Sequence, residues 1–210
     1  MFSIFDQYFK KYDTWYEKNK FTYLSELKLL SKLVPKDKKG LEIGVGTGRF
    51  AESLGIKYGI DPSVNMLKIA KGRGVKIKKA SGENVPFKDN VFEYVVIVIT
   101  LAFVNSPQKV IKEAWRVLNN NGKIIIGIVD SNSFLADFYR NKEGAFYKEA
   151  KFVKVNQLTQ WLKAAGFYNL IYYQTLFNLP RDMTEIEKPR SGFGQGGFVA
   201  VIAGKNISHI

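Results

Sequence analysis

An alternating glycine triplet with acidic residues nearby is the first feature of this sequence that could do chemistry. The stretch GLEIGVGTGRF places Gly44, Gly46 and Gly48 directly after a short apolar run that contains Glu42. Asp61 ends the next apolar run, KYGID. Glycine-rich turns between a strand and a helix bind nucleotides, because a backbone without side chains can approach the ligand closely. The pattern therefore predicts a nucleotide-type site and leaves its ligand open.

The spacing of the glycines argues against two common phosphate-binding loops. The dinucleotide fingerprint Gly-x-Gly-x-x-Gly needs a glycine at position 49, where Arg49 stands. No Gly-Lys-Ser/Thr follows the triplet, so the P-loop pattern is absent as well. Spacing alone therefore disfavours NAD and a P-loop nucleotide.

The charge beside the turn favours a cationic ligand. A carboxylate at Glu42, just before the first glycine, would repel a pyrophosphate and attract a cation. S-adenosylmethionine carries a sulfonium and an ammonium group and no phosphate, so it fits this turn. The two carboxylate oxygens of Asp61 can bind both hydroxyls of an adenosine ribose. They would serve NAD equally well, so Asp61 indicates an adenosine site without choosing between the two cofactors.

The elements that would position these residues alternate between strand and helix. Strands are predicted at 41–45, 57–61, 75–80, 92–100, 123–130, 169–177 and 196–205. The run FEYVVIVIT is apolar on both faces, which is typical of a central strand that helices cover on each side. The pattern predicts a Rossmann-like, doubly wound α/β fold with helices on both faces of a mostly parallel, seven-stranded sheet. No helix-sized segment separates the last two strands, so the last strand is expected to be antiparallel.

Helix ends are predicted from local signals. Ser63 is placed to cap the helix in PSVNMLKIAKGRG, which Gly72 or Gly74 would end. The amphipathic helix that begins at SPQKVIKEAWRVL is expected to stop at the turn Asn121–Gly122.

Length and composition are those of one globular domain. The chain has 210 residues, of which 46% are hydrophobic and 14% aromatic, enough for a sizeable core. No repeat or low-complexity linker divides it, so 1–210 is predicted to be a single domain. Within it, 1–34 is rich in aromatic residues at helical spacing and is expected to form a helical cap.

The net charge of +13, from 32 basic and 19 acidic side chains, suits a nucleic acid, an acidic surface or an acidic substrate. A lysine-rich solvated surface explains it equally well. The densest basic run, KIAKGRGVKIKK, contains no aromatic residues that could stack on bases. Nucleic-acid binding therefore stays open without being favoured.

Several classes of protein are disfavoured by what the sequence lacks. No apolar stretch approaches the length of about 20 residues that a membrane span needs, and the N-terminus shows no leader pattern. The chain contains no cysteine, which excludes disulfides, thiolate catalysis and zinc–thiolate sites. We therefore expect a cytoplasmic protein without membrane partners and without a bound metal, since no cluster of ligands at metal-binding spacing is present.

Taken together, the motifs resemble a class I S-adenosylmethionine-dependent methyltransferase, of the small-molecule type called methyltransferase type 11. The segments YDTWYE, LEIGVGTGRFA, GIDPSVNMLKIAK, GENVPFKDNVFEYV, KVIKEAWRVLNNNGKIII and LTQWLKAAGF follow one another in family order. The match covers about residues 12–130 by motif and the remainder more weakly. Each motif is weak alone, and their order and spacing make the resemblance specific. It implies an enzyme that transfers the methyl group of S-adenosylmethionine to a small-molecule acceptor.

The resemblance also implies a cofactor site. The glycines would pass under the methionine part, the acid after the second strand would bind the ribose, and the loop after the third strand would read the adenine edge. The end of the central strand would lie beneath the sulfonium. The residues of this implied site are Glu42, Gly44, Gly46, Gly48, Asp61, Pro62, Met66, Ser81, Gly82, Glu83, Ile99 and Thr100.

Three positions depart from the usual family pattern. Ser81 stands where many members have aspartate, so a hydroxyl would contact the adenine there. Glu93 replaces an aspartate of mainly structural role, and NNNG replaces a Pro-Gly-Gly turn. None of these changes removes the implied cofactor site.

Methyl transfer from a sulfonium depends mainly on positioning for in-line attack, which can contribute roughly 7–11 kcal/mol. A general base would add only about 10²–10⁴-fold. The sequence assigns no catalytic residue. His209 is the only histidine and is expected to fray near the chain end, and Phe103 stands where many relatives carry a histidine. Asp130, Glu149 and the tyrosines remain candidates for a base.

The acceptor pocket is expected between the cap at 1–34 and an insert at 131–155. Its predicted lining is aromatic and consists of Tyr8, Tyr12, Trp15, Phe103, Tyr139, Phe146 and Tyr147. Aromatic walls suit a flat apolar acceptor or a cationic amine, whereas the basic composition suggests an anionic one. Two alternatives stay open: an RNA or protein acceptor on the same fold, and an adenosine-cofactor-binding domain without methyl transfer. The oligomeric state is not predicted.

Overall fold

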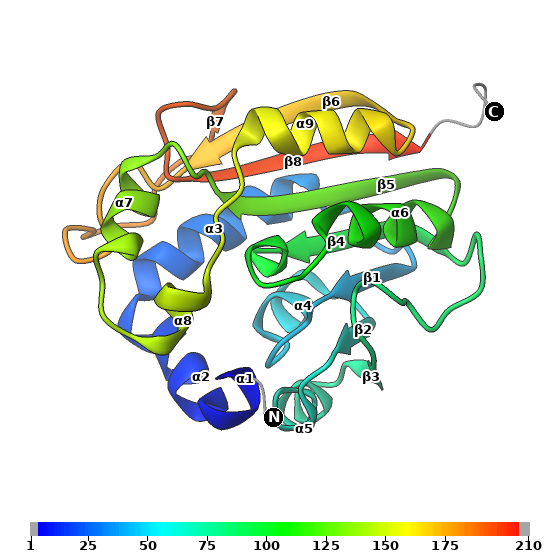
Figure 1. The fold of residues 1–210 in the computed structure, drawn as a ribbon, viewed down its shortest axis with the longest axis horizontal. Coiled ribbons are helices and arrows are strands. Elements are labelled where there is room, and N and C mark those ends of the chain that lie inside the picture. The colour runs from blue at the N-terminus through cyan, green and yellow to red at the C-terminus, as the bar shows by residue number, and fades with distance from the viewer. Residues whose placement is uncertain (1–3, 206–210) are drawn as a thin grey trace.

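A mixed β-sheet forms the centre of the molecule, and the structure, a computed structural model, describes residues 4–205. Its strands are β1 (Gly40–Ile43), β2 (Tyr58–Asp61), β3 (Lys76–Lys79), β4 (Phe92–Val98), β5 (Leu118–Val129), β6 (Phe167–Thr175), β7 (Arg190–Ser191) and β8 (Phe198–Lys205). They lie in the order β3-β2-β1-β4-β5-β8-β6-β7 (Figure 1). The pairs from β3 to β5 are parallel, and β8 runs antiparallel to both β5 and β6.

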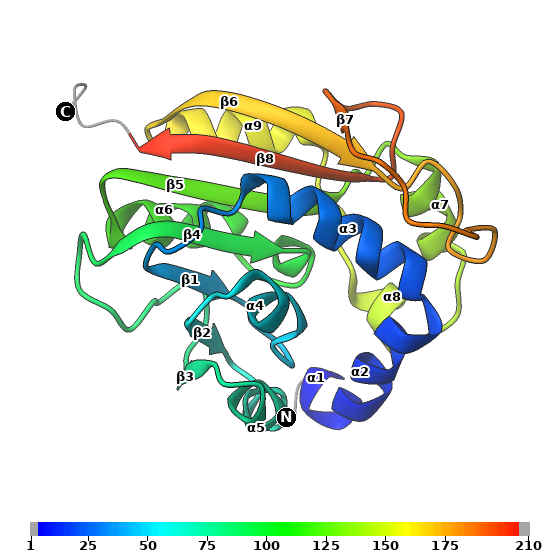
Figure 2. The same cartoon turned by 180° about the vertical axis from the view of Figure 1, so that it is seen from behind.

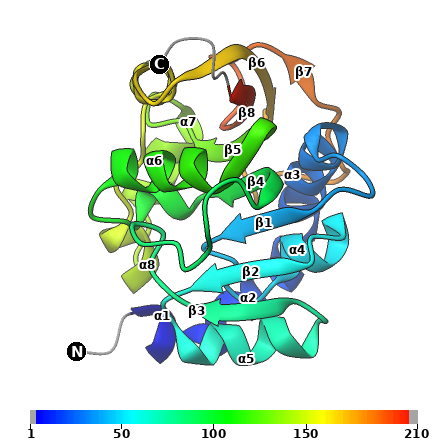
Figure 3. The same ribbon diagram turned by 90° about the vertical axis from the view of Figure 1, so that its right-hand side faces the viewer.

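Helices cover both faces of the sheet. They are α1 (Ile4–Gln7), α2 (Phe9–Lys18), α3 (Lys20–Leu33), α4 (Arg49–Leu54), α5 (Val64–Gly72), α6 (Pro107–Val117), α7 (Phe134–Arg140), α8 (Ala145–Glu149) and α9 (Val155–Ala164), with a short 3₁₀ turn, η1 (Thr100–Ala102). Figure 3 shows α6 on one face and α3 and α4 on the other. Two buried cores result, one under α6 and α9 and one under α3, α4 and α5. The predicted doubly wound α/β fold is confirmed, and so is the antiparallel last strand.

The cap helices and the segment after β5 lie beyond the carboxyl ends of the parallel strands. Figure 2 shows α1, α2, α7 and α8 on the side toward which the arrows of β1 and β4 point. Ligands of open α/β sheets bind at this edge, where loops from several strands meet. The arrangement therefore places the aromatic N-terminal segment beside the glycine turn.

Ion pairs hold α2 against α4 and the end of α5. The Asp13 carboxylate accepts hydrogen bonds from Arg49 at 2.9 Å and 3.0 Å and from Arg73 at 2.9 Å and 3.0 Å. Arg49 begins α4 and Arg73 follows α5, so one carboxylate joins α2 to both helices. Paired arginine–carboxylate contacts of this kind fix orientation as well as distance.

Local signals predicted some helix ends correctly and one incorrectly. Ser63 caps α5, because its Oγ accepts a hydrogen bond from the Met66 N–H at 3.2 Å. The expected helix end at Asn121–Gly122 is wrong: α6 ends at Val117, and β5 begins at the next residue. Phe92 of β4 pairs with Leu118, and Tyr94 pairs with Lys123, so the register shifts between these two pairs. The residues of β5 between Leu118 and Lys123 form an irregularity of the β-bulge type.

Two further features of the sheet differ from the prediction. The central strand ends at Val98 rather than at Thr100, because Ile99 turns out of the sheet with a positive φ of 60°. The two residues of β7 pair with Tyr173 and Gln174 and add an eighth strand at the edge of the sheet. Among residues 4–205, no helix has both the length and the apolar character that a membrane span requires.

Candidate active site

The glycine turn follows β1 and passes close to the end of β4. Gly44 has a φ of +74°, and a Cβ there would lie 2.2 Å from the Thr100 Oγ1. Gly46 has a φ of +52°, and a Cβ there would meet only the Tyr12 ring, at 3.7 Å. Both positions thus favour glycine for backbone conformation, and Gly44 also for space. Gly48 serves a different purpose, since it lets α5 approach at Ala70.

Asp61 connects the end of β2 to this turn. Its Oδ2 accepts a hydrogen bond from the Gly46 N–H at 3.0 Å, and its Oδ1 accepts one from the Ser63 N–H at 2.8 Å. Burial raises the pKa of Asp61 to about 6, even though these two N–H groups act to lower it. Each carboxylate oxygen keeps a further lone pair with which to accept a ligand hydroxyl.

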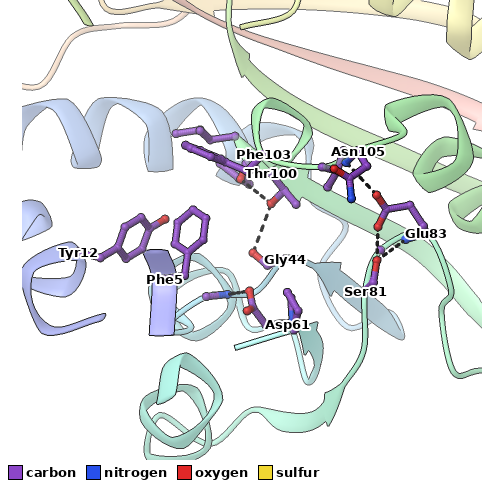
Figure 4. A pocket seen from close by; sticks show the side chains of 15 residues that line it. Phe5, Tyr12, Gly44, Asp61, Ser81, Glu83, Thr100, Phe103 and Asn105 are labelled. Atoms are coloured by element: carbon purple, nitrogen blue, oxygen red, sulfur yellow. Dashed lines mark hydrogen bonds between the residues drawn. The ribbon is translucent and has the colours of Figure 1, made fainter. Parts of the chain in front are cut away.

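A cavity of about 330 Å³ opens above the turn, and Figure 4 shows the side chains that line it. Much of the predicted cofactor set lies on its wall: Gly44, Gly46, Asp61, Pro62, Ser81, Gly82, Glu83, Ile99 and Thr100. Two members of the predicted acceptor set, Tyr12 and Phe103, line the same cavity. Phe5, Val98, Val104 and Asn105 complete the wall and were not among the predicted site residues.

Three predicted cofactor residues lie outside the cavity wall. Gly48 packs against α5, and the Met66 side chain is buried in the core. The Glu42 side chain was expected beside the ligand, but it is 2% exposed and points into the core. Burial and the neighbouring charge of Asp61 raise the pKa of Glu42 well above its ordinary value. Its Oε2 has no hydrogen-bond partner among the described residues.

The loop between β3 and β4 forms the far wall. The Glu83 Oε1 accepts hydrogen bonds from the N–H groups of Asn105 at 3.0 Å and Ser106 at 3.3 Å, and its Oε2 accepts one from the Ser81 hydroxyl. Burial opposes the charge of this carboxylate, but these hydrogen bonds prevail and lower the pKa of Glu83. Glu83 therefore holds this loop to the segment before α6. No sequence signal marked Asn105, an ordinary loop asparagine.

The end of β4 carries backbone strain. Ile99 adopts a left-handed conformation, which is unusual for a β-branched residue and is found mostly where structure or function imposes it. The next residue, Thr100, donates a hydrogen bond from its Oγ1 to the Val98 carbonyl at 3.1 Å, with the Gly44 carbonyl at 3.4 Å. The strained turn thus places Thr100 against the glycine turn at the cavity wall.

Aromatic side chains close the cavity on the cap side. The Phe5 ring lies 5.8 Å from Tyr12, 5.0 Å from Phe103 and 5.3 Å from Phe146, measured between ring centroids. Phe5 and Tyr12 come from α1 and α2, and Phe146 comes from α8. In Figure 4, Phe5 and Tyr12 stand opposite the wall that Ser81 and Glu83 form.

The remaining predicted acceptor residues lie behind this wall. Tyr8 packs its ring against Phe146 at 6.2 Å and is partly exposed. The Trp15 Nε1–H donates a hydrogen bond to the Tyr147 hydroxyl at 3.2 Å, and Tyr147 stacks on Tyr139 at 5.2 Å. They form the packing behind the cavity rather than its surface.

The candidates for a general base are mostly remote from the wall. Asp130 is buried, and its Oδ1 accepts backbone hydrogen bonds from Asn132 and Val155. Glu149 is exposed on α8, and His209 lies outside the described residues. Tyr12 is the candidate tyrosine that reaches the wall. Within the described residues, no group of histidine and carboxylate side chains is arranged to hold a metal ion.

Comparisons with known proteins identify the family. Residues 41–126 match the methyltransferase domain family. A crystal structure of an S-adenosylmethionine-dependent methyltransferase from Thermotoga maritima, described as a possible histamine N-methyltransferase, shares 43% identity with this chain. It superposes with a TM-score of 0.92 over 97% of this chain and 98% of its own. The chain belongs to the class I S-adenosylmethionine-dependent methyltransferases.

Two further relatives of this methyltransferase differ in how much of the chain they match. An uncharacterized protein of Methanocaldococcus jannaschii is 45% identical over 205 residues, which cover 97% of this chain and 99% of the relative. A demethylmenaquinone methyltransferase of a Geobacillus species is 35% identical over 106 residues, 44% of this chain and 45% of the relative. S-adenosylmethionine is therefore the cofactor of this enzyme.

The cavity of the methyltransferase fits that cofactor. Its wall carries two carboxylates, Asp61 and Glu83, and no lysine or arginine among the described residues, although the chain as a whole has a net charge of +13. Such a wall suits a positively charged ligand and opposes a pyrophosphate.

Proposed function

We propose that this methyltransferase acts on a small-molecule acceptor that enters between the cap and the insert. One observation carries the proposal: the glycine turn, Asp61 and the aromatic side chains Phe5, Tyr12 and Phe103 line a single cavity. Its volume of about 330 Å³ lies in the range of small-molecule sites, about 300–1,000 Å³.

We further propose how the chain holds its cofactor. Asp61 would accept the ribose hydroxyls, Ser81 and Gly82 would face the adenine, and Gly44 and Gly46 would let the methionine part lie against the backbone. The bound cofactor supplies a methyl group on a positively charged sulfur. The chain's own part is to orient the acceptor toward that methyl group and to exclude water, which is where most of the rate gain of such a transfer arises.

In this proposal α1 and α2, from the N-terminal segment expected to be the cap, cover the acceptor side, and residues 131–155 form an insert over it. The aromatic contacts of Phe146 with Phe5 and Tyr12 support a shared role, since they join α8 to two rings that line the cavity. The absence of cysteine supports a cytoplasmic location.

The names of relatives also support a small acceptor. The Thermotoga maritima protein is described as a possible histamine N-methyltransferase, and the Geobacillus protein as a demethylmenaquinone methyltransferase. A rice relative, 31% identical over 140 residues, is a 2-methyl-6-phytyl-1,4-hydroquinone methyltransferase. All three names describe low-molecular-weight acceptors.

A labelled-methyl assay tests the proposal. The purified chain is incubated with S-adenosylmethionine labelled in its methyl group and, separately, with histamine, a pool of small-molecule extract, total RNA and a protein lysate. We expect label in the small-molecule reactions alone, and much less of it there with the Asp61→Ala variant at a cofactor concentration below saturation. Label that enters RNA or protein and no small molecule would contradict the proposal.

A further inference from the structure

One carboxylate, that of Glu83, connects two segments of the cavity wall that are far apart in the sequence. Residues 81–83 belong to the loop between β3 and β4, and residues 103–105 lie between η1 and α6. Every residue of both segments lines the cavity. Figure 4 shows hydrogen bonds that run from Asn105 through Glu83 to Ser81. Glu83 is therefore placed to control how the two segments sit relative to each other.

Contacts within the chain use most of the hydrogen-bonding capacity of this carboxylate. Its Oε1 accepts the N–H groups of Asn105 at 3.0 Å and Ser106 at 3.3 Å, and its Oε2 accepts the Ser81 hydroxyl. Burial opposes the charge, but the hydrogen bonds lower the pKa of Glu83, so the group is ionised at neutral pH. A carboxylate has about four acceptor positions, and these contacts occupy all but one. Little capacity remains for a ligand.

Glu83 fixes the end of segment 103–105 that leads into α6. Ser106 is the N-cap residue of α6, and its own side chain makes no capping hydrogen bond within the described residues. Glu83 instead accepts the N–H groups of Ser106 and of the residue before it, at a helix end that favours negative charge. At the other end of the segment, the Ala102 carbonyl accepts the Lys151 N–H at 2.8 Å. Segment 103–105 is thus held by the insert on one side and by Glu83 on the other.

A second carboxylate holds the same loop to α6 at a point away from the cavity. The Glu113 Oε2 accepts the Val85 N–H at 2.7 Å, and the Arg116 Nε–H donates to the Glu113 Oε1 at 2.8 Å. Arg116 also donates to the Val85 carbonyl at 2.9 Å. Val85 is 3% exposed and packs in the core rather than on the cavity wall. Glu113 therefore offers a matched comparison for Glu83: the same residue type and the same two elements, without the cavity wall.

The segment that Glu83 holds carries part of the predicted acceptor side. The Phe103 ring lies 5.0 Å from the Phe5 ring of α1, measured between centroids, and both rings line the cavity. In-line methyl transfer depends on the alignment of the acceptor, so a displacement of about 1 Å can cost up to about a hundredfold in rate. A shift of segment 103–105 would therefore slow the transfer even where the cofactor stays bound.

We propose that Glu83 is a positioning residue for the acceptor: through the Asn105 and Ser106 N–H groups it holds segment 103–105 where an acceptor meets the methyl group. The inference rests on the proposed small-molecule function and assigns one of its residues. It differs from the direct cofactor contact that the family resemblance implies for Glu83. A cofactor contact would depend on the charge of Glu83, whereas positioning depends on the reach of its side chain.

Two variants of Glu83 separate charge from reach. Glu83→Gln removes the charge but keeps an oxygen that can accept both N–H groups, and Glu83→Asp keeps the charge but shortens the side chain. Glu113→Asp is the control, since it makes the same truncation at the contact away from the cavity. Calorimetry with S-adenosylhomocysteine measures the cofactor site, and labelled-methyl transfer to the small-molecule extract at saturating S-adenosylmethionine measures the reaction. Hydrogen–deuterium exchange of the S-adenosylhomocysteine complex reports the Asn105 and Ser106 N–H groups.

We expect Glu83→Asp to transfer methyl groups about tenfold more slowly or worse, with faster exchange at Asn105 and Ser106. Its affinity for S-adenosylhomocysteine should stay within about threefold of wild type, because the cofactor contacts remain. Glu83→Gln should resemble wild type in all three measurements, and so should Glu113→Asp in transfer and cofactor affinity. A merely structural role would move cofactor affinity and transfer together, and would make the Glu83 and Glu113 truncations alike.

Three results would overturn the inference and leave the proposed function standing. One is a loss of cofactor affinity in Glu83→Asp or Glu83→Gln that matches the loss of transfer, which would make Glu83 a cofactor ligand. Another is slow transfer by Glu83→Gln together with normal transfer by Glu83→Asp, which would make charge the decisive property. The third is wild-type transfer or wild-type exchange in Glu83→Asp. Failure of wild type to label any small molecule, with S-adenosylhomocysteine still bound, would instead reject the proposed function and the inference with it.

Discussion

The Asp61 carboxylate accepts a hydrogen bond from the Gly46 N–H at 3.0 Å, and this contact joins the end of β2 to the glycine turn after β1. The same carboxylate accepts the Ser63 N–H at the start of α5. One side chain thus arranges both segments that border the cavity and remains able to accept ligand hydroxyls. Its removal should therefore affect the cofactor more than the fold.

Asp61→Ala is expected to weaken binding of S-adenosylmethionine and S-adenosylhomocysteine by about tenfold to a hundredfold, because hydrogen bonds to a charged group contribute about 1.5–3 kcal/mol. Isothermal calorimetry measures this loss. Asp182→Ala serves as the control, since Asp182 is exposed and pairs only distantly with Arg181, at 3.7 Å. Equal affinity in Asp61→Ala and wild type would remove Asp61 from the proposed site.

Gly46→Ala separates folding from binding. A Cβ at Gly46 meets only a Tyr12 atom at 3.7 Å, so the variant should fold and lose roughly 1 kcal/mol through its positive φ. Gly55→Ala carries the same backbone cost, with nothing within 4 Å of its Cβ. We expect both variants to lose similar stability in urea denaturation. Only Gly46→Ala should lose cofactor affinity, because its methyl group would stand on the cavity wall; normal binding by this variant would be contrary evidence.

Asp13 is expected to hold the cap in place. Burial alone would raise its pKa, but the hydrogen bonds from Arg49 and Arg73 outweigh burial and hold the pKa of Asp13 well below its usual range. The stabilisation is therefore complete above the unfolded-state pKa of about 4 and is lost as the pH falls below it. Asp13→Asn should unfold with roughly 2 kcal/mol less free energy at pH 7 and with a smaller deficit at pH 3. A deficit that does not depend on pH would contradict this account.

Glu26, a buried residue of α3, should make stability depend on pH in the opposite direction to Asp13. Burial raises its pKa from 4.5 to about 8, so the folded state keeps a proton that the unfolded state releases above about pH 4.5. The free energy of unfolding should therefore fall as the pH rises from about 4.5 to about 8. Glu26→Gln lacks this slope and should be roughly 3 kcal/mol more stable than wild type at pH 7, with little difference at pH 4. Parallel pH profiles of the two proteins in urea denaturation would show that Glu26 does not titrate as described.

Much of the fold could be predicted because its signals are local. Apolar runs broken by glycine and capping residues mark the parallel strands and their helices, and the cap at Ser63 depends on one side chain and the backbone after it. The end of α6 was misjudged because the Asn–Gly pair, a strong turn signal in isolation, lies within a bulged strand that β4 holds in place. A two-residue strand such as β7 carries no periodicity at all.

The site was harder to predict where it depends on packing between distant segments. Glu42 was expected at the cavity, but Leu41 and Ile43 point into the core under α6, so the alternation of a strand turns Glu42 to the opposite, buried face. Nothing in the sequence of α3 distinguishes Glu26 from its other polar residues. Its burial arises only when α3 packs into the core.

Calorimetric titration of the wild-type chain with S-adenosylhomocysteine and, in parallel, with NAD tests the central claim most directly. The account predicts a single site for S-adenosylhomocysteine and no measurable heat from NAD, since the cavity offers carboxylates and no cation to a pyrophosphate. Tight binding of NAD without binding of S-adenosylhomocysteine would contradict it.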